Sequence, residues 1–176
     1  MIPHGEAYTI TKFFTDKESG YSPSQYFVYR YNRYAEEFMK NLPKDMKLEN
    51  CRPEMEVIHP SKYNIMGYNK VGAMMIFNDN RGWWSGSLMD EYDASLLLEN
   101  KFGPTVIQVA GGVYSAFMWS LHNRNAGNRW PEDLDSDFIL EHAKPFLGRI
   151  WSNYVDLNQT HLKDCYKLES FLTKKM

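Results

Sequence analysis

The stretch VGAMMIF at residues 71–77, followed by NDNRG at 78–82 and WW at 83–84, decides the fold of this 176-residue chain. Its apolar run is typical of a β-strand, and Asn, Asp and Gly between two apolar runs indicate a tight turn. Residues 54–58 form another short strand candidate, separated from this run by Pro60 and Gly67. This part of the chain therefore predicts an antiparallel meander.

Further strands are predicted on both sides of the meander. Residues 7–14 and 25–31 are rich in β-branched and aromatic side chains, which favour strands, and residues 150–156 form a third candidate. The polar cluster at residues 16–20 indicates a loop after the first of these segments.

Other segments have apolar residues at helical spacing. The clearest is a helix that begins near Pro104 and carries an apolar stripe. This stripe comprises Val106, Val109, Ala110, Val113, Phe117 and Leu121. Helices are also predicted at residues 32–41, 90–99, 135–144 and 159–174. The elements together predict an α+β class, with an antiparallel or mixed sheet and packed helices in a single domain of residues 1–176.

Gly111 and Gly112 lie inside the helix that begins near Pro104. Two glycines in a helix cost about 2 kcal/mol relative to two alanines, so another interaction must offset them. We expect the helix to be pressed closely onto the sheet at this point, and direct contact with a ligand is the alternative.

Composition excludes several classes of function. The 20 basic and 22 acidic residues nearly cancel, and Lys174-Lys175 is the longest basic run, so we expect no nucleic-acid partner. Cys51 and Cys165 are too few for a disulfide framework, which favours a reducing cytoplasm. The sequence shows no signal peptide and no apolar run of the length that spans a membrane, so we expect a soluble protein that is not exported.

His4-Gly5-Glu6 is the most suggestive local cluster of polar residues. On an extended segment, residues two apart point to the same face, so the imidazole and the carboxylate would converge. Such a pair can move protons near neutral pH and hold an ammonium ion. The alternative is that both side chains simply face solvent near the chain terminus.

Other chemistries have little support in the sequence. The histidines show no paired spacing for a metal site. No Gly-x-Gly-x-x-Gly loop or phosphate-binding loop is present, so this chain cannot hold a dinucleotide in the usual way by itself. Ser85, Ser87 and Cys165 lack the local signature of a nucleophile. Aromatic residues make up 15% of the chain, which indicates a ligand surface or an interface if core packing does not use them.

Several motifs occur in the order found in one enzyme family. They are IPHGEAYTI at residues 2–10, YSP at 21–23, YFVY at 26–29, Trp84 with Gly86-Ser87, the helix at 105–119, EDLD at 132–135 and AKPFLG at 143–148. This order resembles bacterial homospermidine synthases, which are enzymes of the saccharopine dehydrogenase-like type. The resemblance covers about residues 2 to 156.

The resemblance implies a function and a set of site residues. The family joins two putrescine molecules, using bound NAD for an aminobutyl transfer that forms homospermidine without net oxidation. His4 and Glu6 are then the expected catalytic residues, and Glu6, Tyr29, Asn69 and Trp84 the expected substrate-binding residues. The family's Rossmann segment precedes these motifs, so we expect NAD to be held mainly by a missing or separate N-terminal half.

One departure from the family pattern concerns the substrate. Asn69-Lys70-Val71-Gly72 stands where the family has Asp-Glu-Leu-Gly, so an amide and a cation replace two carboxylates. An ammonium ligand would then lose a charged partner. Ser85 also stands beside Trp84 where the family has Tyr.

Two functions are consistent with these observations. The first is the C-terminal part of a homospermidine synthase, inactive alone, that contributes the putrescine site in a homo-oligomer or with a separate Rossmann-domain chain. The alternative is a non-catalytic binding or oligomerisation domain derived from this family.

Overall fold

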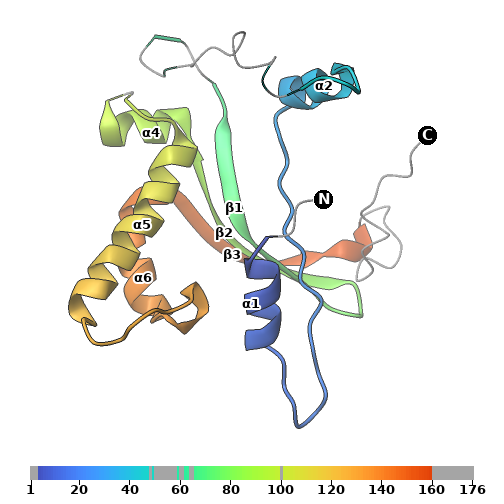
Figure 1. Cartoon of the computed structure of the whole chain (residues 1–176), viewed down its shortest axis with the longest axis vertical. Helices are drawn as coiled ribbons and strands as arrows, with labels where there is room; N and C mark the ends of the chain where they lie inside the picture. The colour runs from blue at the N-terminus through green and yellow to red at the C-terminus, as the bar shows by residue number, and fades with distance from the viewer. Residues whose placement is uncertain are drawn as a thin grey trace. The chain divides into compact units, whose positions relative to one another are not determined.

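The computed structural model describes residues 4–47, 49, 59, 62–63, 66–99 and 101–159 (Figure 1). These residues belong to two compact units. Unit 1 contains the described residues of Met1–Val57 and Asn125–Ser136, and unit 2 those of Ile58–Arg124 and Asp137–Met176. The single domain of residues 1–176 stays a prediction.

Unit 2 is built on an antiparallel sheet in the order β1-β2-β3. Strand β1 (Tyr68–Ile76) and strand β2 (Arg81–Asp90) form a hairpin, and strand β3 (Arg149–Asp156) pairs with the other edge of β2. Asn80 adopts a φ of 59° in the turn, a conformation that Asn tolerates better than most residues. The predicted hairpin and the predicted strand at 150–156 are confirmed.

Three helices of unit 2 lie beside the sheet (Figure 1). They are α4 (Glu91–Leu98), α5 (Pro104–His122) and α6 (Ser136–Ala143), and all three were predicted. Asp90 caps α4, because its carboxylate accepts from the backbone N–H of Asp93 at 2.9 Å. Pro104 occupies the first turn of α5, where its missing N–H leaves no helical hydrogen bond unmade.

A small core joins these helices to one face of the sheet. Met89 from β2, Ala94 from α4 and Ile107 from α5 are buried together, and Phe146 packs against them. Phe146 lies in the short 3-10 helix η3 (Lys144–Phe146) that follows α6. The fold is therefore α+β, as predicted, with helices packed on an antiparallel sheet.

Of the two glycines in α5, only Gly111 lies at a close packing contact. A Cβ atom on Gly111 would lie 2.6 Å from the Cβ atom of Phe146, which is far closer than two carbon atoms can approach. A Cβ atom on Gly112 would meet nothing within 4 Å. Close packing thus explains Gly111, as expected, although the partner is the Phe146 side chain and not the sheet.

Unit 1 contains the helices α1 (Glu6–Phe13) and α2 (Arg33–Asn41). The predicted helix at residues 32–41 is confirmed, and Asn32 caps it by accepting from the N–H of Ala35 at 2.8 Å. The predicted strand at residues 7–14 is wrong, because this segment forms α1. Its less exposed residues are 7, 9, 10 and 11, and three of these are consecutive, so they do not alternate as in a half-buried strand.

Two other strand predictions and one helix prediction had different outcomes. Residues 25–31 form neither a strand nor a helix, so that strand prediction is wrong. The predicted strand at 54–58 and nearly all of the predicted helix at 159–174 lie outside the described residues. Within the described part of the chain, no helix is long and apolar enough to cross a bilayer.

Candidate functional site

His4 and Glu6 lie in contact at the start of α1. The Nδ1 atom of His4 is 3.1 Å from Oε2 of Glu6, and both side chains are close to half exposed, at 45% and 48%. Helix α1 begins at Glu6, so the carboxylate lies where the helix dipole favours a negative charge. The predicted convergence of the two side chains is therefore present, although a helix start and not an extended segment brings them together.

The imidazole of His4 is also held from a second side. Its ring stacks on the ring of Phe27, with centroids 3.9 Å apart and planes 6° from parallel. A carboxylate can only accept, so a hydrogen bond in this pair needs the proton on Nδ1 of His4. Nε2 of a neutral His4 is then the ring atom that can accept a proton from another molecule.

Tyr29 lies in unit 1 as well, on the segment that also carries Phe27. Its ring meets that of Tyr31 edge to face, with centroids 4.8 Å apart, and 64% of the residue is exposed. Its role as a substrate-binding residue stays a prediction, as does a cavity shared by the His4-Glu6 pair with Tyr29 or Trp84.

Asn69 in unit 2 belongs to a chain of polar contacts between β1 and α5. Its Nδ2 atom donates to Oε1 of Gln108 at 2.6 Å. The Nε2 atom of Gln108 donates in turn to Oγ of Ser87 at 3.1 Å and to the carbonyl of Leu147 at 3.2 Å. Gln108 and Ser87 are each only 6% exposed. Asn69 thus has a structural role, because its side chain links β1 to α5.

Trp84 lies on β2 within a cluster of aromatic rings and one cation. The ammonium of Lys70 is 4.8 Å from the centroid of the Trp84 ring and 5.3 Å from that of Trp151. The Trp84 and Trp151 centroids are 6.5 Å apart. We call Lys70, Trp84 and Trp151 the Lys70 cluster.

The sheet register places Asn69 and Trp84 on opposite faces. Asn69 pairs with Met89, and Lys70 pairs with Leu88. Side chains alternate along a strand, so Asn69 shares the face of Met89, which packs against the helices. Lys70 and Trp84 lie on the other face. The structure therefore brings His4 and Glu6 together but does not bring Asn69 and Trp84 together.

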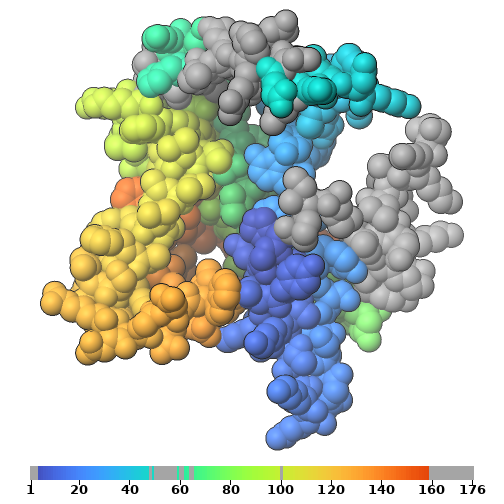
Figure 2. All heavy atoms as spheres, in the orientation of Figure 1, coloured from blue at the N-terminus to red at the C-terminus, as the bar shows by residue number. Residues whose placement is uncertain are grey.

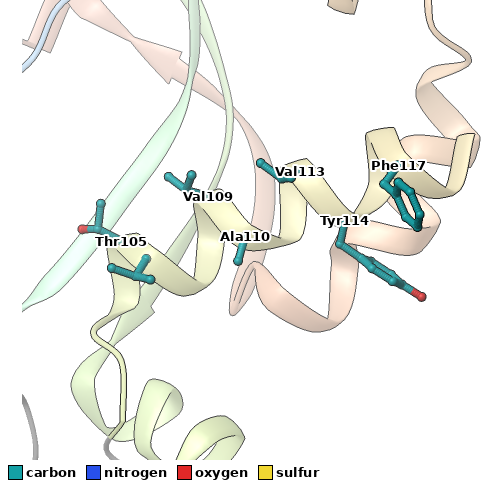
Figure 3. A pocket seen from close by; sticks show the side chains of 7 residues that line it. Thr105, Val109, Ala110, Val113, Tyr114 and Phe117 are labelled. Atoms are coloured by element: carbon teal, nitrogen blue, oxygen red, sulfur yellow. The ribbon is translucent and has the colours of Figure 1, made fainter. Parts of the chain in front are cut away.

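An exposed apolar face runs along α5, and it also bears on function. Val109, Val113 and Phe117 on this face are 62%, 66% and 58% exposed. With Thr105, Val106, Ala110 and Tyr114 they line a shallow apolar hollow on the helix (Figure 3). Helix α5, drawn in yellow, is visible in the space-filling view (Figure 2).

Four residues that organise these clusters are not among the site residues expected from the sequence. They are Phe27, Lys70, Gln108 and Trp151, which provide the ring stack, the cation, the central amide and the second indole. Gln108 carried a signal, because a polar residue beside a stripe of valines is unusual in a packed helix. Trp151 carried none, since only the register of β3 places it beside Trp84.

The chain is similar in sequence to homospermidine synthases. It is 24% identical over 164 residues to the enzyme of Mesorhizobium japonicum and 22% identical over 160 residues to that of Blastochloris viridis, in each case over 89% of this chain. The resemblance to homospermidine synthases that the sequence motifs indicate is therefore confirmed. The chain spans 32% of the length of these two curated relatives. It matches no model of a known protein family.

The fold is similar to part of a solved homospermidine synthase. The structure of that enzyme from Legionella pneumophila, in complex with NAD, superposes with a TM-score of 0.71 at 21% identity. The match covers 94% of this chain and 36% of the Legionella chain. The α+β fold described above is thus the fold of one part of that larger protein.

Proposed function

We propose that this chain contributes the amine site of a homospermidine synthase, for an NAD-dependent aminobutyl transfer that joins two putrescine molecules. The contact between His4 and Glu6 carries the proposal. Both residues belong to the motif that resembles the family, and a proton-transfer role would require their side chains to lie this close together. The similarity to homospermidine synthases over 89% of the chain supports it.

Glu6 and His4 would have different roles toward a diamine. The carboxylate of Glu6 would accept hydrogen bonds from a substrate ammonium, which are among the stronger hydrogen bonds of proteins. His4 would remove a proton from the amine through Nε2 while Glu6 holds the proton on Nδ1. The stack on Phe27 fixes the plane of the imidazole, so the direction of Nε2 is fixed as well.

The described residues do not fit the pyrophosphate of NAD. Such a group binds at a helix N-terminus that follows a glycine-rich turn. Within the described part, α1 and α5 each follow one glycine, Gly5 and Gly103, without the repeated glycines of such a turn. Pro104 further removes one N–H donor from the start of α5. We therefore assign NAD mainly to a separate nucleotide-binding part.

The exposed face of α5 supports association as part of this proposal. Valines at positions 106, 109 and 113 recur every three or four residues, the spacing that packs one helix against another. We assign the face to a second copy of this chain, since both copies would present the same stripe. Light scattering of the purified chain tests this, with Val113→Glu expected to give the monomer and Val113→Ala to leave the oligomer intact. If light scattering shows that the parent chain is a monomer, the assignment to a second copy is wrong, and a separate Rossmann-domain chain becomes the proposed partner of this face.

Reconstitution tests the catalytic proposal. The chain is mixed with the nucleotide-binding part of a homospermidine synthase, NAD and putrescine, and the product is measured by chromatography. We expect homospermidine from the parent chain and at least a tenfold loss with Glu6→Gln, because an ammonium loses its charged partner. Glu37→Gln, an exposed acid on α2, is the matched control and should keep full activity. Equal activity of Glu6→Gln and the parent contradicts the proposal.

Two contacts favour the second candidate, a non-catalytic domain. Asn69 is engaged by Gln108, and Lys70 occupies the aromatic faces that a substrate ammonium would use. A stably associated pair of chains that forms no homospermidine supports this second function.

A further inference from the structure

In the Lys70 cluster, one ammonium group lies near two indole rings. An ammonium within about 6 Å of an indole centroid is attracted by the negative face of the ring. The Nζ atom of Lys70 meets this condition for both rings, at 4.8 and 5.3 Å. None of the ion pairs among the described residues includes Lys70. The two indoles are thus the partners of this cation in that part of the chain.

The absence of side chains at two glycines leaves room for the Trp84 ring at this place. Gly72 and Gly86 are direct cross-strand partners, and a Cβ atom on either would lie 2.7 or 2.9 Å from the Trp84 ring. The indole therefore needs the absence of both side chains. Trp151 pairs with Gly86 on the other side of β2, which places the second ring next to the first. Four positions on three strands cooperate in this arrangement.

The Lys70 side chain indicates which kind of ligand the two rings could bind. A lysine side chain is a 4-aminobutyl group, so Lys70 presents to the two rings what an unbranched primary alkylamine would present. The side chain is exposed, and both indoles are partly exposed. An external amine and Lys70 would therefore compete for one surface, with Lys70 favoured because it is tethered.

We propose that the Trp84-Trp151 pair is a binding site for primary alkylammonium ions that Lys70 occupies in cis. Removal or displacement of Lys70 exposes the site to external amines. Trp84 is also an expected substrate-binding residue, so this inference rests in part on the proposed function, although the ligand class follows from the two rings and from Lys70. The test uses the 176-residue chain alone, without NAD or putrescine, and so separates the two.

The test compares the parent with Lys70→Met, which keeps an unbranched side chain and removes the ammonium. Each protein is titrated with n-butylammonium chloride at constant ionic strength, and the indole N–H signals are followed by NMR. We expect saturable shifts in Lys70→Met with an affinity roughly tenfold above that of the parent, as for two cation-π contacts. Lys70→Arg keeps a cation in place and should behave like the parent.

A second substitution establishes where the ligand binds. Lys70→Met combined with Trp151→Leu should lose most of the gained affinity, while circular dichroism shows that the fold is kept. If Lys70→Met fails to fold, Lys70→Gln replaces it in the same titration. Equal affinities for the parent and the charge-removed variant, absence of saturation in both, or affinity that survives the loss of Trp151 would each overturn the proposal.

Discussion

The side-chain amide of Asn69 donates a hydrogen bond of 2.6 Å to Oε1 of Gln108, and this contact fixes the orientation of both amides. The carbonyl of Leu147 can only accept, so the nitrogen of Gln108 must face it. The oxygen of Gln108 then faces Asn69, which must present its own nitrogen. Each amide is satisfied in one orientation only.

Asn69→Asp should destabilise unit 2, because a carboxylate would face the oxygen of Gln108. Rotating the Gln108 amide would instead place its oxygen against the carbonyl of Leu147. We expect a loss of about 1–3 kcal/mol in the free energy of unfolding, measured with urea. Asn128→Asp, at an exposed position, is the control. A variant at position 69 as stable as the parent would show that the network adapts.

Gly111→Ala and Gly112→Ala should have opposite effects on stability. A methyl group at position 111 would collide with Phe146, and such overpacking costs typically 1–3 kcal/mol. At position 112 the methyl group meets open space, so the gain in helix propensity of roughly 1 kcal/mol remains. Thermal unfolding of both variants measures the difference. Equal shifts for the two variants would contradict the packing of Phe146 on α5.

Glu91→Gln should change how stability depends on pH. Burial and then the charge of Asp90 raise the pKa of Glu91 above its ordinary value of 4.5. The folded state therefore binds the proton more tightly, and stability falls as the pH rises from the ordinary pKa through the raised one. Glu91→Gln should remove this fall, so it is more stable than the parent at pH 7 and similar to it at pH 4. Urea unfolding at both values of pH decides this, with Glu37→Gln as the exposed control.

Phe27→Leu should weaken catalysis in the reconstituted enzyme without removing a catalytic group. The imidazole of His4 would lose the ring that fixes its plane, and misplaced catalytic groups cost up to about 100-fold in rate. We expect a lower kcat for homospermidine formation. Tyr34→Leu, at an aromatic residue that is 82% exposed, should leave the rate unchanged. An unchanged kcat for Phe27→Leu would remove the positioning role from this residue.

Local signals predicted the hairpin, three helices and β3 of unit 2 because each is specified by its own residues. Asp90, Pro104 and the turn at 78–82 carry strong preferences that the tertiary structure does not oppose. The Tyr, Thr, Ile and Phe residues of the segment 7–14 favour a strand, whereas its four less exposed positions, 7, 9, 10 and 11, do not alternate. In the candidate site, the short spacing of His4 and Glu6 in the sequence was enough to predict their contact. It could not find Phe27, which only the chain path of unit 1 brings to the imidazole.

Strand β3 closes the sheet from far along the chain. Roughly 60 residues separate it from its partner β2, so their pairing requires closure of a long loop and is expected to be slow. During synthesis, the hairpin and α4 and α5 leave the ribosome before β3 exists. One edge of β2 therefore stays open in the nascent protein, and that edge is where a chaperone would be needed or where two nascent chains would pair wrongly.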